Sequence, residues 1–277
     1  MTSTTPIWIM QGAFGRATVN LTDKALVEHA HQEFNVLLKL GGADAQFRSG
    51  TQALSLDDRS VLLFNPWVPH LKLANERGPT MILSLIIDAV WLGRLLASQG
   101  VALGQTFPNL REDITDDVRL NAERLAAAIP QQLLGEAGDC EDLLTDLLDA
   151  ISRAYVDPSA SRLEAAAFRP IDFRIRKALH FIREHALENP DIGRIAAEVG
   201  LSRSRFFEQF RRCVGVSPQH YIDHFRVKIA THWLSTTDRS LVEIAEELGF
   251  GSHSTFTRFF TQHLAVSPSE FRRQTTS

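Results

Sequence analysis

The chain has 277 residues, of which 44% are hydrophobic and 22% charged, and its formal net charge is −4. These values are ordinary for a globular protein and suit one large domain or two smaller ones. The most apolar stretch contains Asp88 and Arg94, which disfavours a membrane span. Two cysteines are too few for a disulfide framework, and residues 1–15 lack the pattern of a signal peptide, so we expect a cytoplasmic protein with no membrane partner.

Short apolar runs separated by turn residues extend through residues 28–87. FNVLLKL, TQALSL, SVLLFNP and TMILSLII are runs of this kind, and GGAD, RSG and NERGP stand between them. Short strands at such regular spacing are typical of an all-β barrel or sandwich. We predict a β-barrel over about residues 16–88.

The apolar period changes between residues 89 and 156. In DDVRLNAERLAAAI and CEDLLTDLLDAISRAY, apolar residues recur three and four positions apart, which predicts two amphipathic helices. Their apolar faces either pack on the barrel or form a dimer interface, and both interpretations are open at this point. Residues 157–170, within VDPSASRLEAAAFRP, are predicted to be a linker.

Residues 171–277 show helical patterns throughout. Ser202 and Ser217 stand where N-caps are expected, Pro218 would occupy a first helical position, and Ser240 has capping-box spacing to Glu243. We predict a compact all-α domain here. The expected fold class is therefore α+β with two domains, an N-terminal domain over residues 1–156 and a helical domain over residues 171–277.

The two parts differ in charge. Residues 169–277 contain 16 basic and 12 acidic residues, whereas residues 1–168 contain 13 and 21. A basic excess is typical of domains that bind polyanions, although many domains without such a partner share it. The charge alone therefore makes nucleic acid a candidate partner and no more.

One unit occurs twice in the helical part. GLSRSRFFEQFRRCVGVSP begins at Gly200, and GFGSHSTFTRFFTQHLAVSP begins at Gly249. Each copy consists of a short helix, a tight turn at glycine and a second helix, which is the pattern of a helix-turn-helix that places its second helix in the DNA major groove. The alternative is a bundle of two similar hairpins with solvated faces. Two matching copies joined by one long helix favour DNA binding.

The second helix of each copy has two different faces. Phe206 with Phe210, and Phe256 with Phe260, are i,i+4 pairs that we expect in the core. Among the polar residues opposite, Arg258 has the chemistry to recognise guanine. Glu208 has the chemistry to accept from cytosine, and Arg211 and Arg212 that to hold phosphates.

Residues 171–273 resemble the DNA-binding domain of AraC/XylS-type transcriptional regulators. The resemblance is carried by IAAEVGLSRSRFFEQFRRCVGVSPQHYIDHFRVKIATHWL and by SLVEIAEELGFGSHSTFTRFFTQHLAVSPSEFRR. It implies base contacts from the exposed positions of both recognition helices, which are Arg203, Ser204, Phe207, Glu208, His253, Ser254, Thr257 and Arg258. The position of Glu208 is frequently basic in the family, so this residue is a departure from the pattern.

The segment VEHAHQEFNVLLKLGG…VLLFNPWVPHLKL resembles the cupin-like sensor domain that precedes this DNA-binding domain. On a strand, His29, His31 and Glu33 point to the same side, and His70 can join them from another strand. A metal site, a small-molecule pocket and purely structural histidines are all open interpretations. Metal-binding cupins place the glutamate further along, where Asn35 stands here, so we favour a pocket and predict no metal. The predicted effector-binding residues are His29, His31, Trp67 and His70.

Together these features predict a transcriptional regulator, an activator by resemblance, that responds to a small-molecule effector bound in the barrel. The implied partners are promoter DNA, the effector, RNA polymerase and a second copy of the chain as a homodimer. We predict no catalytic residues and no cofactor. The alternative is a metal-dependent cupin enzyme with an appended helical domain.

Overall fold

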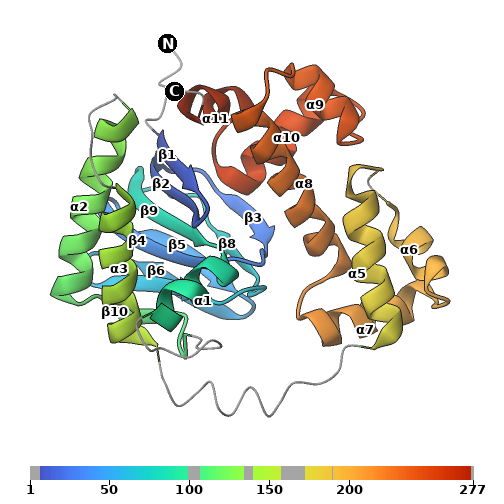
Figure 1. Ribbon diagram of the computed structural model, residues 1–277, viewed down its shortest axis with the longest axis horizontal. Coiled ribbons are helices and arrows are strands. Elements are labelled where there is room, and N and C mark those ends of the chain that lie inside the picture. The colour runs from blue at the N-terminus through green and yellow to red at the C-terminus, as the bar shows by residue number, and fades with distance from the viewer. Residues whose placement is uncertain (1–6, 99–106, 134–139, 157–171, 189, 276–277) are drawn as a thin grey trace.

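The computed structural model describes residues 7–98, 107–133, 140–156, 172–188 and 190–275. The predicted linker, residues 157–170, lies outside these ranges. A β-rich part comes first and an all-helical part follows it, as Figure 1 shows. No helix in the described ranges has the length and apolar character needed to cross a membrane.

The strands form two antiparallel sheets. Six strands pair in the order β1-β2-β9-β4-β7-β10, and four pair in the order β3-β8-β5-β6. The sheets pack as an open, cupin-like barrel, called the barrel below. The strands are β1 (Ile7–Gly12), β2 (Gly15–Thr22), β3 (Leu26–His29), β4 (Phe34–Gly42), β5 (Ala45–Ser49), β6 (Gln52–Leu56), β7 (Ser60–Phe64), β8 (His70–Lys72), β9 (Thr80–Ile87) and β10 (Arg111–Asp113).

The six-stranded sheet is buried on both faces. On β4, Leu37 enters the core between the two sheets with Phe64 and Ile82. Its neighbours Val36 and Leu38 point the other way, into the core beneath the following helices. Because successive side chains of a strand alternate between faces, a strand covered on both sides has a continuous apolar run. This explains why FNVLLKL and TMILSLII are largely apolar and do not alternate strictly.

Strand β1 lies upstream of residue 16, where the sequence analysis starts the barrel. It pairs with β2 from Ile7 to Gly12. Its buried Ile7 and Ile9 join the core of the helical part, in the cluster that contains Phe271. The burial of this strand thus depends on a partner more than 200 residues away in the chain, which local patterns do not reveal. The short β10 was not predicted either.

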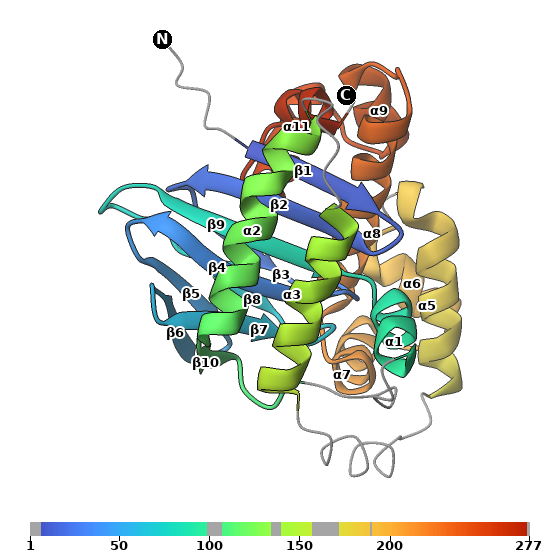
Figure 2. The ribbon, with the colours of Figure 1, turned by 60° about the vertical axis from the view of Figure 1, so that its left-hand side comes forward.

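Within the described ranges, three helices follow the barrel: α1 (Ala89–Ser98), α2 (Asp116–Leu133) and α3 (Cys140–Tyr155). Figure 2 shows α2 and α3 side by side over one face of the six-stranded sheet. Leu125 and Ile129 of α2, with Leu144 and Leu147 of α3, are fully buried there. Packing on the barrel, one of the two interpretations of these apolar faces, is therefore confirmed.

The helical part consists of two similar units joined by the long helix α8 (Figure 1). Buried residues of the first unit cluster around Phe206 and Phe210, and those of the second around Phe256 and Phe260. Each unit thus has its own core. The helices are α5 (Phe173–His185), η1 (Ala186–Glu188, a 3-10 turn), α6 (Ile192–Glu198), α7 (Arg203–Val214), α8 (Pro218–Thr236), α9 (Leu241–Glu247), α10 (His253–Leu264) and α11 (Pro268–Thr275).

Candidate DNA-binding surface and interdomain cavity

The two helix-turn-helix units are built in the same way from local sequence. Gly200 and Gly249 end the first helix of each unit with φ of 68° and 70°, a conformation that glycine adopts without strain. Ser202 and Ser252 cap the second helices by accepting from backbone N–H groups three residues later. The predicted cap at Ser202 and the two glycine turns are confirmed, whereas the cap at Ser252 was not predicted.

The phenylalanine pairs fix which face of each second helix is free. The rings of Phe206 and Phe210 lie 5.5 Å apart, those of Phe256 and Phe260 lie 5.8 Å apart, and all four are fully buried. The opposite faces are open to solvent, and Phe207 is 40% exposed. Thr257 is half-buried, and the other predicted DNA-contacting residues are exposed: Arg203, Ser204, Phe207, Glu208, Arg211, Arg212, His253, Ser254 and Arg258.

Helix α8 sets the spacing of the two units. Its 19 residues correspond to about 28 Å at the usual rise of an α-helix. Figure 1 shows α7 near one end of α8 and α10 near the other. Successive major grooves on one side of DNA lie about 34 Å apart, so this spacing suits two adjacent grooves.

Arg226 is a structural residue of the second unit that sequence analysis missed. Its guanidinium is buried, donates to the carbonyl of Leu248 at 2.8 Å and lies 3.9 Å from the ring centre of Phe250. Burial lowers the pKa of this guanidinium. The arginine thereby holds the turn between α9 and α10 against α8.

A cavity of about 640 Å³ lies between the barrel and the helical part. Its barrel wall includes His29, His31 and His70, and its helical wall includes residues of α8 and the C-terminal end of α10. Seven of the ten histidines in the chain line it. Three of the four predicted effector-binding residues are therefore brought together in one cavity.

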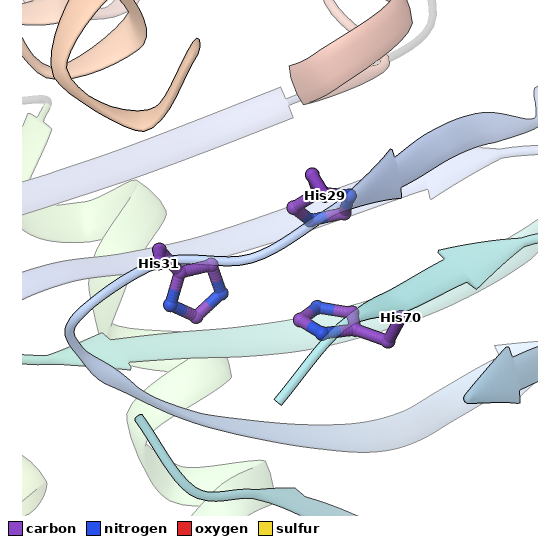
Figure 3. Close-up of side chains that lie close together, drawn as sticks. All are labelled: His29, His31 and His70. Atoms are coloured by element: carbon purple, nitrogen blue, oxygen red, sulfur yellow. The ribbon is translucent and has the colours of Figure 1, made fainter. Parts of the chain in front are cut away.

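The three barrel histidines face one another, as Figure 3 shows. Ring centres are 4.5 Å apart for His29 and His70, 5.3 Å for His31 and His70, and 5.9 Å for His29 and His31. One nitrogen of each ring lies within 4.8 Å of the others. This convergence was expected from the sequence, although β3 ends at His29 and His31 lies just beyond it.

Burial keeps four histidines of this cavity, His29, His31, His70 and His224, neutral. It lowers the pKa of His70 to about 3 and that of His224 to about 4, and the neighbouring His31 adds to the effect on His70. The pKa values of His29 and His31 also lie well below the ordinary value, chiefly because of burial. At neutral pH each of these rings therefore retains one nitrogen lone pair.

Trp67 is not among the cavity-lining residues. Its ring stacks on Tyr221 of α8 with centres 4.8 Å apart and meets His224 edge-on at 5.2 Å. Its backbone has a positive φ of 64°, and its N–H donates to the carbonyl of His31 at 2.7 Å. Trp67 therefore packs against α8 outside this cavity, and its prediction as an effector contact stays a prediction.

Several cavity residues were missed by sequence analysis. Arg16 on β2, Lys72 on β8 and Lys228 on α8 bring positive charge to the cavity, and Glu33 brings negative charge. Burial lowers the pKa of Arg16 to about 10, and Glu33 opposes this shift. The alternation of polar and apolar residues in RATVNLT is the local signal that places Arg16 on one face of β2 with Thr18 and Asn20, which also line the cavity.

Comparison with known proteins supports the interpretation of the helical part as a DNA-binding domain. A family model described as a helix-turn-helix domain matches residues 195–274. The chain is 24% identical over 254 residues to the virulence regulon transcriptional activator VirF of Yersinia enterocolitica, covering 89% of this chain and 91% of VirF. It is 36% identical over 104 residues to the arabinose operon regulatory protein of Escherichia coli, covering 37% of this chain and 36% of that protein.

Solved structures of ToxT from Vibrio cholerae share the two-domain fold. The apo form of a ToxT point variant has a TM-score of 0.56 at 14% identity and covers 98% of this chain and 97% of its own. ToxT bound to an unsaturated fatty acid has a TM-score of 0.52 at 14% identity, with 99% and 95% covered. With its duplicated helix-turn-helix and cupin-like N-terminal domain, the chain is similar over most of its length to AraC-type DNA-binding transcriptional regulators.

Proposed function

We propose that a small molecule bound in the interdomain cavity changes how the two recognition helices engage promoter DNA. The observation that carries this proposal is the position of the cavity, whose walls come from the barrel and from α8 and α10. A molecule held there contacts the sensor and the helix that sets the spacing of both DNA-reading units. It therefore favours one relative posture of the domains over another, which is the requirement for coupling.

We propose that the effector has an apolar body and an acidic group. Ile9, Leu37, Phe47 and Ile82 supply apolar wall, in keeping with the general composition of ligand pockets. Within the described residues, the guanidinium of Arg16 makes no hydrogen bond or ion pair, and its aromatic contact is the ring of Phe271 at 5.9 Å. An arginine without a carboxylate partner is well suited to bind one.

The ToxT structure with an unsaturated fatty acid supports the same class of effector, since that ligand combines an apolar chain with a carboxylate. At 14% identity the two chains share the fold alone, so the ligand class rests on the residues of this cavity. Oleate is therefore the first compound to test.

We propose that the DNA contacts come from the exposed residues of α7 and α10. Arg203, Ser204, Phe207 and Glu208 would meet one groove, and His253, Ser254, Thr257 and Arg258 the next, with Arg211 and Arg212 on phosphates. The exposure of these faces supports this assignment.

We further propose activation of transcription through contact with RNA polymerase, action as a homodimer, and a cytoplasmic location where promoter DNA is found. VirF is named a transcriptional activator, which supports the sign of regulation. The rival function, a metal-dependent cupin enzyme, is not favoured, because the relatives matched are transcriptional regulators.

The test is DNA affinity with and without oleate. A target sequence is first selected from a random DNA pool, and its Kd is then measured at increasing oleate for the wild type, Arg16→Gln and Arg77→Gln. Arg77 is an exposed arginine outside the cavity lining and serves as the matched control. We expect oleate to change the Kd for the wild type and for Arg77→Gln, and to act only at higher concentration on Arg16→Gln.

Calorimetry measures oleate binding separately. An unchanged Kd in all three proteins, together with no detectable oleate binding, would contradict the ligand class. If oleate binds but leaves DNA affinity, dimerisation and transcription unchanged, the coupling between the cavity and the DNA-binding helices is wrong.

A further inference from the structure

The three barrel histidines form a group of ligands suited to a metal ion. His29, His31 and His70 each bring one ring nitrogen within 4.8 Å of the others. Imidazole is a preferred ligand of Zn²⁺, Ni²⁺, Cu²⁺ and Fe²⁺, whereas Mg²⁺ and Ca²⁺ require oxygen ligands. We propose that His29, His31 and His70 bind one divalent transition-metal ion.

The hydrogen bonds of the three rings leave one free nitrogen lone pair on each. The Nδ1 atoms of His29, His31 and His70 lie 2.8, 3.0 and 2.9 Å from the backbone carbonyls of Val27, Glu33 and Val68 respectively. A carbonyl only accepts, so each Nδ1 carries the hydrogen and each Nε2 keeps its lone pair. Metal-binding histidines typically have this arrangement, in which a backbone carbonyl fixes the tautomer and the ring orientation.

One of these lone pairs has no partner. The Nε2 atom of His31 is buried and makes no hydrogen bond within the described part of the chain. A buried polar atom without a partner is unfavourable, and a metal ion would satisfy it. The Nε2 of His70 lies 3.2 Å from the amide nitrogen of Asn35, so binding would exchange this hydrogen bond for a metal bond.

The spacing of the rings is close to that of a tetrahedral site. With metal–nitrogen bonds of about 2.05 Å, ligating nitrogens lie about 3.3 Å apart and imidazole centres about 5.2 Å apart. The observed ring centres are 4.5, 5.3 and 5.9 Å apart. The nitrogens themselves lie within 4.8 Å of one another, so side-chain rotation would have to bring them up to about 1.5 Å closer to complete the site.

The sequence pattern disfavours a metal because Asn35 stands where cupins place a glutamate. The tertiary structure weakens that objection, since three neutral imidazoles are already sufficient ligands for an open metal site. It also brings the Glu33 carboxylate within 3.9 Å of His31 Nδ1, which adds negative charge nearby. Lys228 and Arg16 oppose this charge, so the imidazoles have to supply most of the affinity.

A fourth histidine near this group comes from the helical part. His263, near the C-terminal end of the recognition helix α10, also lines the cavity, and its ring centre lies 6.4 Å from that of His29. Its Nδ1 lies 2.8 Å from the carbonyl of Phe259, so its Nε2 is also unprotonated. At its present distance His263 lies outside the three-histidine group, and we expect it to contribute little to affinity.

The test uses Co²⁺, whose visible absorption reports tetrahedral coordination, and tag-free protein stripped with a chelator. Binding is measured in the wild type, His29→Ala, His70→Ala and His180→Ala. His180 and Glu184 form an exposed i,i+4 pair at 3.1 Å, which is the obvious competing surface site. We expect one Co²⁺ per chain in the wild type and in His180→Ala, and binding weaker by at least about tenfold in each barrel variant.

A second divalent ion and a folding control make the result decisive. Zn²⁺ should displace Co²⁺ with the same 1:1 stoichiometry, and circular dichroism should show that His29→Ala remains folded, because His29 lies half-exposed at the end of β3. His263→Ala should weaken binding less than His70→Ala does. The proposal is overturned if Co²⁺ does not bind stoichiometrically, or if His180→Ala or His263→Ala reduces binding more than the barrel variants.

Discussion

The Nζ atom of Lys228 lies 3.2 Å from Oε1 of Glu33, which joins the centre of α8 to the segment before β4 across 195 positions of the chain. Glu33 is 8% exposed, so its carboxylate depends on partners for its charge. His224, one turn earlier on α8, has its Nδ1 3.9 Å from the same carboxylate. The Glu33–Lys228 ion pair therefore links the barrel directly to the helix that joins the two DNA-reading units.

Removing the lysine should destabilise the protein. Lys228→Met leaves the buried Glu33 carboxylate without its cation, and we expect the free energy of unfolding to fall by about 1–3 kcal/mol. Glu33→Gln together with Lys228→Met should recover part of this loss, because neither charge then remains. Thermal unfolding of the four proteins of the cycle measures the coupling. Strictly additive effects would show that the pair contributes no interaction energy.

Two adjacent phenylalanines on α7 should behave differently. Phe206 is fully buried, and Phe206→Ala should cost about 3–5 kcal/mol of stability. Phe207 is 40% exposed, and Phe207→Ala should cost less than about 1 kcal/mol while it alters DNA binding. Chemical denaturation and DNA titration of both variants measure the difference. Equal destabilisation would mean that Phe207 belongs to the core and has no place on the DNA-facing side.

Arg258 is the exposed arginine near the middle of α10, and Arg258→Ala should relax specificity at particular base pairs. We expect a loss of about 1–3 kcal/mol on the selected target and a smaller loss on random DNA. Competition titrations against both DNAs measure it, with Arg94→Ala on α1 as a matched control that should change neither. An equal loss on both DNAs would place Arg258 on phosphate.

Substitution of Glu208 tests the base-reading role of the first helix-turn-helix unit. Because a carboxylate in the major groove accepts from cytosine and is repelled by phosphate, Glu208→Ala should change which sequences are selected and should not weaken total binding. Repeating the selection from the random pool with this variant measures the change. An unchanged motif would remove Glu208 from the base-reading face.

Acid should destabilise the protein partly through His224. Burial holds the pKa of His224 at about 4 in the folded protein, with Glu33 raising it and Lys228 lowering it. The unfolded chain binds a proton near pH 6.5, so between these values the unfolded state holds more protons. Stability is therefore lost as the pH falls from about 6.5 to about 4, and this residue accounts for about 2 kcal/mol at pH 5 relative to pH 7.

The comparison of wild type with His224→Gln checks this prediction. The free energy of unfolding of both metal-free proteins is measured at pH 7 and at pH 5. The variant should lose less stability on acidification. His224 also lowers the pKa of His31, so the difference between the two proteins includes this coupling as well as the protonation of His224 itself. Identical losses would mean that His224 is protonated in the folded state at pH 5.

The sequence by itself determined the helical part almost completely. The caps at Ser202 and Ser217, the capping box of Ser240 and the turn at Gly249 depend on residues within a few positions, so they are visible in the local sequence. The repetition of the same local solution in two copies then indicated the helix-turn-helix and its reading faces. The succession of short strands and turns in the barrel was predictable for the same reason.

Only the tertiary structure decided the relation between the two parts. The burial of Ile7 and Ile9 against the second unit, the stacking of Trp67 on Tyr221 and the pairing of Glu33 with Lys228 join residues about 150 to more than 200 positions apart. Such contacts depend on the packing of whole elements, which no local period encodes. The same packing encloses the cavity and brings together seven histidines that the sequence distributes from residue 29 to residue 263.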